Sequence, residues 1–548
     1  MSSRVSENSL EDGLDQPMSE RMDEKERQCQ DEDKTPLDSP GPKDTSSYSV
    51  ADSTQSNQGV DNDNTINDVE KQDDNSDTLD SDKSFEVKFD GGENDPMSPK
   101  NKPLLRKWCI TLLVSFSSLC VTCASTLYTS TYLQLEKDFD VSRLVATIGL
   151  TTYVCGLGLG PMFLSPFSEF YGRRIIYICA FGIYFIFLIP CAVAQNIQTM
   201  LVVRFFDGLA GSAFLSVAGG TVGDMFTKQT LSMPMTIYTV SPFMGPCIAP
   251  VMGGFINQFA DWRWSFWVLV IWAGIQWIMI VLFVPETYAP VILRKKAIQK
   301  RKDTGDDRWY APIEKMDRSV TQFVLWSCIR PFQLLIFEPM CLNLCLLSAI
   351  LLGILYLFFG AFAVVFTHSH GFNQWQVGLT FLGIMVGMII GVSCDPLWRR
   401  NRDRLIRNNG GISEPEFRLP PTVLGACLIP VAMFGFGWTS YPWVHWIVPI
   451  VFSGLFGLGN IFCFSGIFTF LVESYPLYAA SALAANSFAR SSFAAAFPLF
   501  GVQMYNNLGY PWASSLLGFI ALAMTPFPYL FFRYGKRLRG RSRFAQAS

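Results

Sequence analysis

The chain of 548 residues is 49% hydrophobic and 14% aromatic, and only 16% of its residues are charged. Such an apolar composition excludes a soluble enzyme and indicates an integral membrane protein. The formal net charge of −3 combines two unlike parts. Residues 1–100 hold 27 acidic and 10 basic residues, whereas the remaining 448 residues hold 19 acidic and 33 basic residues.

Residues 1–100 are rich in Ser, Asp, Asn, Gln and Glu and contain few apolar side chains. Such a segment buries too little surface to offset the entropy cost of ordering the chain. It also lacks the basic start and short apolar core of a cleaved signal peptide. We therefore expect a disordered acidic cytoplasmic tail over residues 1–100, and we expect the first hydrophobic helix to direct membrane insertion.

Twelve apolar runs follow, each about 20 residues long, which is the length that crosses about 30 Å of hydrocarbon as a helix. The first six lie near residues 108–128, 145–165, 175–194, 199–221, 234–256 and 264–284. The second six lie near residues 339–365, 375–394, 420–437, 445–471, 478–502 and 511–532. This pattern predicts an all-α membrane protein with twelve transmembrane helices.

Basic residues indicate on which side each loop lies, because cytoplasmic loops carry an excess of Lys and Arg. If the tail is cytoplasmic, cytoplasmic segments hold 28 of the 33 basic residues, and external loops hold only Lys137, Arg143 and Arg263. The other two, Arg204 and Arg490, fall inside predicted helices. Both termini are therefore predicted to be cytoplasmic. The basic clusters abut or closely follow membrane spans, so they indicate contact with the lipid bilayer, and we expect no nucleic-acid partner.

The long connection over residues 285–335 divides the spans into six and six, which indicates an internal duplication. We expect an N-terminal six-helix bundle over residues 101–284 and a C-terminal six-helix bundle over residues 336–534. Residues 285–335 then form a cytoplasmic linker, and residues 535–548 form a basic cytoplasmic tail.

A similar polar element lies between the second and third helix of each half, with an acidic residue four positions before an Arg pair. Such an Arg pair can reach carboxylates and helix C-terminal carbonyls, so the two loops are candidate gating latches. Gly172 permits a positive φ in the first loop. Ordinary anchoring by positive charge is the alternative interpretation. The candidate residues are Glu169, Gly172, Arg173 and Arg174 in the first half, and Asp395, Arg399 and Arg400 in the second.

The first of these loops resembles the G-x-x-x-D-R-x-G-R-R element of the major facilitator superfamily. From about residue 100 to about residue 540, the chain resembles the twelve-span drug:H+ antiporters of fungi within that superfamily. Glu169 stands where Asp is usual, Ser165 replaces the first Gly and Phe170 replaces the first Arg. The resemblance implies two pseudo-symmetric six-helix bundles and a proton-coupled exporter.

The fourth span contains Arg204 and Asp207, in a segment that resembles the family's R-x-x-x-G-x-x-G pattern for proton coupling. A charge near the bilayer centre costs about 2.5–3.5 kcal/mol on insertion scales, so each of these residues needs a partner or a wet cavity. The two are three positions apart and can meet on one helix face. Asp207 is the carboxyl group that we expect to gain and lose a proton. A permanent structural ion pair is the alternative interpretation.

The fifth span contains Gly245, Pro246, Pro250, Gly253 and Gly254, which resemble the G-P-x-x-x-P-x-x-G-G element that antiporters of the superfamily carry and symporters generally lack. Two prolines bend a helix, and glycines allow a neighbouring helix to approach closely. A packing kink would explain the same residues. The expectation of export therefore depends on the family resemblance.

Several aromatic and polar residues are candidates for lining an apolar cavity, although an aromatic residue can equally well face lipid. They are Tyr128, Phe214, Tyr238, Phe359, Phe464, Asn486 and Arg490.

The sequence contains no catalytic triad, metal cluster, cofactor motif or Walker-type Gly-Lys-Ser/Thr. Of its 14 cysteines, only Cys29 and Cys328 lie outside the predicted spans. The other cysteines lie inside the spans, where small apolar thiols suit helix packing. We therefore expect neither an enzyme nor a bound metal or other cofactor.

With the family resemblance, the sequence predicts alternating access of a central site to a small-molecule substrate and to protons. We expect a monomer in the plasma membrane, with an internal membrane as the alternative. An uptake symporter for a vitamin or amine, and a membrane nutrient sensor that transports nothing, remain as alternative functions.

Overall fold

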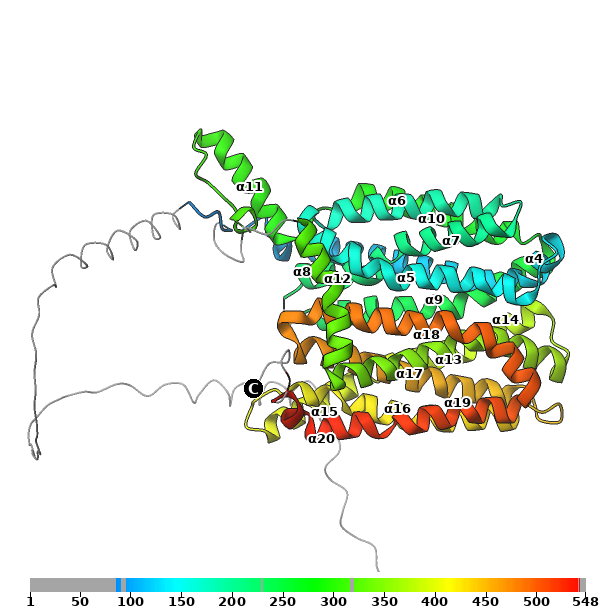
Figure 1. Cartoon of the computed structure of the whole chain (residues 1–548). Coiled ribbons are helices and arrows are strands. Elements are labelled where there is room, and N and C mark those ends of the chain that lie inside the picture. Colours follow the sequence, from blue (N-terminus) through cyan, green and yellow to red (C-terminus); the bar gives the residue numbers. More distant parts are fainter. Residues whose placement is uncertain (1–84, 90–94, 228–229, 316–319, 541, 543–548) are drawn as a thin grey trace, which may run out of the picture. The chain divides into compact units, whose positions relative to one another are not determined.

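Helices make up most of the chain that the structure describes (Figure 1). The structure is a computed structural model, and it describes residues 85–89, 95–227, 230–315, 320–540 and 542. Among these residues, eleven helices are long and apolar enough to cross a membrane.

The first six predicted spans all coincide with helices. Ser212 interrupts the fourth span, and a short helix, α4 (Tyr132–Asp138), follows the first. The helices are α3 (Leu104–Leu127), α5 (Arg143–Tyr171), α6 (Arg173–Ala192), α7 (Ile197–Gly211) with α8 (Ala213–Met225), α9 (Ser232–Phe259) and α10 (Arg263–Phe283).

The second six predicted spans also coincide with helices. They are α13 (Pro339–His370), α14 (Gln374–Ser393), α16 (Pro420–Thr439), α17 (Ile447–Ser474), α18 (Ala479–Leu508) and α19 (Tyr510–Met524), which α20 (Pro526–Arg539) continues. Besides α4, three α-helices of the described residues lie outside the predicted spans: α11 (Ala289–Thr304) and α12 (Val320–Phe337) in the connection between the halves, and α15 (Asp395–Asn408) after α14.

Local sequence sets several helix ends. The side chains of Ser142 and Asn196 accept hydrogen bonds from the backbone N–H groups of Val145 (3.4 Å) and Thr199 (2.9 Å), so they cap the starts of α5 and α7. Gly172 ends α5 with a φ of 95°, a backbone conformation that other residues rarely adopt. The chain therefore passes directly from α5 into α6.

Helix packing divides the spans into two groups. In the first half, α3 packs against α9, α5 against α7, and α6 against α7 and α10. In the second half, α13 packs against α18, and α17 packs against α14 and α16. Two further pairs, α9 with α14 and α5 with α18, join the halves.

The outer face of α10 shows that lipid is the solvent of this bundle. Ile271, Ile275, Ile278 and Leu282 recur at spacings of three and four residues, and each is between 55% and 68% exposed. A continuous apolar stripe of this kind is unfavourable in water and favourable against hydrocarbon chains.

The eleventh predicted span is a 30-residue helix, α18, yet it is not among the eleven apolar helices. Polar residues in its middle lower its hydropathy: Asn486, Ser487, Arg490, Ser491 and Ser492. Because α18 packs against α13, α5 and α12, protein covers much of its surface. With α18 included, the described residues provide twelve spans.

Candidate functional site

The predicted proton-coupling residues lie where α5 and α7 cross at close range. A Cβ atom on Gly156 would lie 2.3 Å from the carbonyl oxygen of Phe205, and one on Gly208 would lie 2.1 Å from that of Tyr153. Glycine at both positions lets the two backbones touch. This crossing fixes Arg204 and Asp207 in the interior of the first half, where both are fully buried.

Arg204 is held by backbone carbonyl groups of two neighbouring helices. Its guanidinium group donates hydrogen bonds to the carbonyl oxygens of Gly149 (3.2 Å), Ala124 (3.1 Å) and Ser125 (3.3 Å). It also lies 4.4 Å from the ring centre of Tyr128 and 4.5 Å from that of Tyr153. Carbonyl dipoles and aromatic faces together stabilise the buried cation.

Asp207 has no such support. Neither carboxyl oxygen has a hydrogen-bond partner among the described residues, and no ion pair is formed with Arg204. The sequence permits the two side chains to meet, but the Arg204 side chain reaches α3 and α5 instead. The electrostatic neighbours of Asp207 include Arg204, Cys120, Tyr153 and Tyr184, although none of them donates a hydrogen bond to it. An ionised carboxylate here would lose its hydration without a compensating hydrogen bond.

The first predicted gating loop forms a network around Arg173. Its guanidinium group donates to Ser168 Oγ (2.6 Å) and to Asp224 Oδ2 (3.4 Å), and lies 4.9 Å from the ring centre of Tyr288. Burial raises the pKa of Tyr288, which lies near Glu169 and Arg173. The loop therefore joins α5, α6 and α8 to the segment after α10.

Glu286 completes this network, and we did not predict its role from the sequence. Its carboxylate accepts hydrogen bonds from the backbone N–H groups of Arg173 (3.0 Å) and Arg174 (3.2 Å), at the positive end of α6. A Cβ atom on Gly172 would lie 2.3 Å from Glu286 Oε2. The available signal was an acidic residue directly after a membrane span.

Lys102 also contacts this residue, since its Nζ donates to the backbone carbonyl of Glu286 at 3.2 Å. Burial and the nearby Arg106 lower the pKa of Lys102 to about 8. The Lys102 side chain, which contacts the Glu286 backbone, therefore loses its positive charge in mildly alkaline solution.

The second predicted gating element differs from the first. Asp395 pairs with Arg399 within α15, one helical turn away, and Arg400 is exposed. No glycine break separates the acid from the Arg pair here, because α15 runs continuously through both. This ion pair is local to one helix.

The antiporter-type residues of α9 lie at two interfaces. On the side facing α3, a Cβ atom on Gly245 would lie 2.0 Å from Thr122 Oγ1, and one on Gly253 would lie 2.6 Å from Ser130 Oγ. On the side facing α14, one on Gly254 would lie 2.9 Å from the carbonyl oxygen of Gln374. Pro246 and Pro250 lie in the same helix.

A matching glycine on α14 completes this contact between the halves. A Cβ atom on Gly378 would lie 2.3 Å from the carbonyl oxygen of Pro250. The side chain of Gln374 also donates a hydrogen bond to the carbonyl of Ser130. These contacts close the end of the bundle at which α9 ends and α14 begins, which we call the short-loop end.

Two of the predicted cavity residues belong to the interior of the first half. Tyr128 donates to the carbonyl of Ala146 (2.9 Å) and packs beside Arg204. The ring of Phe214 packs against Tyr177 and Phe181. Their buried contacts therefore serve helix packing.

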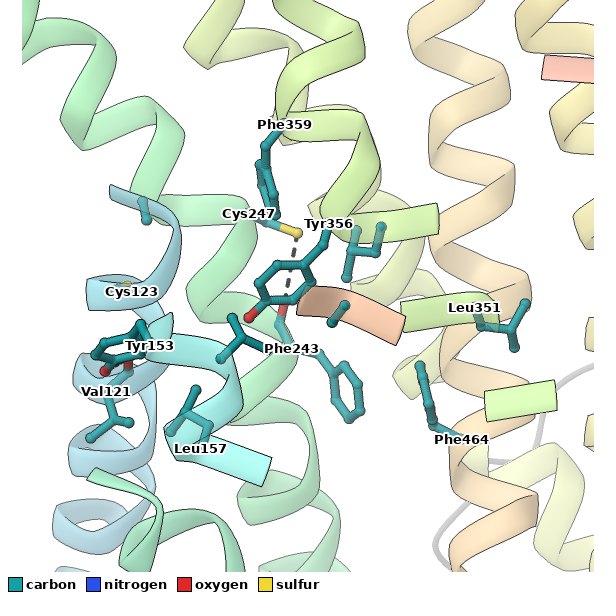
Figure 2. Close-up of a cluster of buried hydrophobic side chains, with 14 of the residues drawn as sticks. Val121, Cys123, Tyr153, Leu157, Phe243, Cys247, Leu351, Tyr356, Phe359 and Phe464 are labelled. Carbon is teal, nitrogen blue, oxygen red and sulfur yellow. Dashed lines mark hydrogen bonds between the residues drawn. The ribbon is translucent and has the colours of Figure 1, made fainter. Parts of the chain in front are cut away.

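The other predicted aromatic residues lie nearer the contact between the halves. Phe243 of α9 and Phe464 of α17 reach toward each other from different halves, with ring centres 4.6 Å apart (Figure 2). The Tyr238 hydroxyl donates to the carbonyl of Leu215 at 3.0 Å. Phe359 stacks on Phe381, 5.2 Å between centres.

A small cavity of about 10 Å³, room for about one water molecule, lies between α5, α13 and α18. Its lining includes Thr147, Tyr356, Phe359 and Pro498. Tyr356, which we did not predict, also shares a hydrogen bond with Ser125 of α3 across the contact between the halves (3.0 Å).

The two predicted polar residues of α18 differ in their contacts. Asn486 is buried and donates to Ser348 Oγ of α13 at 2.7 Å. Arg490 lies against three aromatic rings, 5.7 Å from the centre of Phe243, 5.6 Å from Phe464 and 5.2 Å from Phe468. The structure therefore brings Arg490 and Phe464 together and places Asp207 elsewhere, inside the first half.

These features define a class. In the part of the chain that the structure describes, twelve membrane-spanning helices lie in two halves that meet along few helices and enclose ionisable side chains, as in α-helical membrane transporters.

Comparison with known proteins gives the family. A family model described as Major Facilitator Superfamily matches residues 114–498. "Efflux pump atB" of Aspergillus terreus is 55% identical over 469 residues, covering 84% of this chain and 90% of that protein. "Probable drug/proton antiporter YHK8" of Saccharomyces cerevisiae is 40% identical, with the same coverage of 84% and 90%. The chain belongs to the major facilitator superfamily.

Solved structures agree on the fold. A partially occluded inward-open structure of the xylose transporter XylE from E. coli matches with a TM-score of 0.56 at 16% identity, covering 78% of this chain and 98% of XylE. The predicted fold class, an all-α membrane protein of two six-helix bundles, is confirmed, and so is the resemblance to fungal drug:H+ antiporters.

Proposed function

We propose that this protein is a proton-coupled antiporter that exports small organic molecules by alternating access. The names of its relatives, an efflux pump and a probable drug/proton antiporter, support export and proton coupling. Within the chain, one observation carries the proposal: the carboxyl group of Asp207 is fully buried and has no partner among the described residues.

Asp207 acts as the proton carrier in this mechanism. Protonation removes a charge that its surroundings do not solvate, so the neutral acid suits the closed arrangement of α5 and α7. Ionisation of Asp207 requires water or a new hydrogen-bond donor. Movement of α5 and α7 relative to each other brings one of these to the carboxyl group. Proton binding at Asp207 is thereby coupled to the conformation of the bundle, with Arg204 as the fixed positive charge nearby.

The orientation follows from the distribution of basic residues. Both termini face the cytosol, so the short-loop end faces outward and is closed by α9 and α14. A proton that enters from outside neutralises Asp207 and favours substrate release, and deprotonation toward the cytosol resets the cycle. The protein works as a monomer, and the plasma membrane is its site.

The first gating loop acts at the opposite, cytoplasmic end. Arg173, Asp224 and Glu286 hold α6, α8 and the segment after α10 together, and rearrangement of these contacts accompanies opening toward the cytosol.

The test is replacement of the carboxyl group. Yeast that lacks its own drug pumps is transformed with the wild type, Asp207→Asn or Asp403→Asn, and challenged with a panel of toxic compounds. Asp403 is an exposed acid on α15 and serves as the matched control. We expect resistance from the wild type and the control and none from Asp207→Asn, at equal membrane abundance. Full resistance from Asp207→Asn would refute the proposal.

Proteoliposomes then distinguish export by exchange from uptake by cotransport. A compound to which the wild type confers resistance is supplied as a gradient, and an internal pH dye reports proton flux. Antiport moves protons against the direction of the compound, whereas a symporter moves both the same way.

A further inference from the structure

The middle of α18 carries a positive charge for which the described residues provide no hydrogen-bond or ion-pair partner. Arg490 takes part in no hydrogen bond or ion pair with any described residue, and its Nε is buried without an acceptor. The amide nitrogen of the nearby Asn486, by contrast, donates a hydrogen bond to Ser348 Oγ. A cation in a membrane span needs a counter-charge, a polar partner or water. Arg490 therefore needs a partner from outside the described residues.

Arg490 keeps some exposed surface although it lies in a membrane span. The residue is partly buried, and of its guanidinium nitrogens only Nε is fully buried without a hydrogen-bond partner. The group has five N–H donors in a planar fork, whereas aromatic rings interact only with its face. The donors at the edge therefore remain free for an acceptor.

The surroundings of Arg490 come from both halves of the protein. Phe243 belongs to the first half, and Phe464 and Phe468 belong to α17 in the second. Figure 2 shows Phe243 and Phe464 approaching each other at this contact. A molecule bound here touches both halves, as the substrate of an alternating-access transporter must.

Within the described part of the chain, the electrostatic neighbours of Arg490 include no carboxylate. They are the hydroxyl groups of Tyr356 and Tyr238 and the thiol of Cys345. A second positive charge would be repelled here, and a neutral acceptor would leave the guanidinium charge without a counter-charge. An acidic oxygen would form charge-assisted, bidentate hydrogen bonds with it.

We propose that Arg490 binds the anionic group of the transported molecule, and that the rings of Phe243, Phe464 and Phe468 cover its apolar part. The substrate class is then small, largely apolar organic acids in their ionised form. This inference rests on the proposed transport function and specifies its substrate.

The experiment compares an acid with its neutral isostere. Radiolabelled 2-naphthoate and 2-naphthamide are bound to the purified full-length protein in detergent at neutral pH, without a proton gradient. We expect the wild type to bind 2-naphthoate at least about tenfold more tightly, because only the carboxylate carries the opposite charge and two equivalent oxygens for a bidentate pair of hydrogen bonds. Equal affinity for the two probes, or no binding of 2-naphthoate, would overturn the inference.

Variants at the same position identify the residue. Arg490→Gln should weaken 2-naphthoate binding by about tenfold or more while leaving 2-naphthamide binding within about twofold. Arg490→Lys should retain part of the preference for the acid. Since Arg490 has no hydrogen bond or ion pair with a described residue to lose, we expect both variants to fold, and size-exclusion chromatography checks this. Retained acid preference in Arg490→Gln would also overturn the inference.

Failure of this inference is distinguishable from failure of the proposed function. Selective binding of 2-naphthoate without proton-coupled export would defeat antiport alone. Proton-coupled export of neutral compounds by a protein that binds both probes equally would defeat the assignment of Arg490 alone.

Discussion

Arg204 is a structural cation, and its contacts differ from those that its sequence position suggests. Three backbone carbonyl groups of α3 and α5 accept its hydrogen bonds, and Asp207 does not. The spacing of the two residues along α7 is visible in the sequence. The identity of the acceptors depends on how closely three helices cross, and no pattern within one helix encodes that.

We therefore expect Arg204→Gln to destabilise the first half. The shorter, neutral amide cannot reach all three carbonyl groups, and loss of one hydrogen bond to a charged group costs about 1.5–3 kcal/mol. Thermal unfolding of the purified protein in detergent should show a midpoint lower than that of the wild type.

Arg263→Gln is the matched control, because Arg263 is partly exposed and pairs with Asp138 and Asp261 near the surface. Exposed pairs contribute about 0–1 kcal/mol, so this midpoint should barely move. Equal midpoints for both variants would contradict the structural role of Arg204.

At the scale of single helices, the hydropathy of the sequence predicts nearly every span. Apolar runs of about 20 residues leave few alternatives in a membrane. We did not predict the role of Glu286, because an acidic residue directly after a span is usually part of a solvated linker. Its role depends on the turn at Gly172, which brings the start of α6 to the Glu286 carboxylate. The neighbouring helices that cover α18 could not be predicted from the residues of α18 either.

The crossing of α5 and α7 yields a prediction for Gly208. In Gly208→Ala the new methyl group would lie 2.1 Å from the carbonyl oxygen of Tyr153, so the two helices must separate. Overpacking of this kind costs about 1–3 kcal/mol, and the unfolding midpoint in detergent should fall.

Gly223→Ala provides the comparison, because it lies in the same span and a methyl group there meets no atom within 4 Å. Replacing a helical Gly by Ala in open space is favourable by about 0.5–1 kcal/mol. A midpoint for Gly208→Ala at or above that of Gly223→Ala would show that the backbones do not touch.

At the scale of the whole molecule, the two halves are joined at the short-loop end by α9 and α14. The sequence predicts the glycines of α9 through the family resemblance, but their partner on the other half, Gly378, has no signature of its own. Contacts between the halves depend on the conformation of the transporter, and a sequence compatible with several conformations does not specify one of them.

Gly378→Ala should loosen the closed short-loop end. The added methyl group would lie 2.3 Å from the carbonyl oxygen of Pro250, on the other half. Hydrogen exchange of the protein in lipid nanodiscs should increase in the C-terminal part of α9 and the N-terminal part of α14.

Gly387→Ala is the control on the same helix, because its methyl group would meet the carbonyl oxygen of Gly454 on α17, within the second half. Faster exchange should then appear where α14 meets α17. If Gly378→Ala and Gly387→Ala gave the same exchange pattern, Gly378 would have no special part in closing the two halves.

The polar character of α18 also affects how the protein is made. An arginine at the centre of a helix opposes release from the translocon into lipid by about 2.5–3.5 kcal/mol, and the serines of α18 add little to offset it. Its packing partners α5 and α13 precede it in the chain, so the ribosome has delivered both before α18 emerges. Their exposed surfaces can then receive α18 directly. The biogenesis of the second half therefore depends on the order of synthesis, with α18 entering the bilayer as part of an assembly.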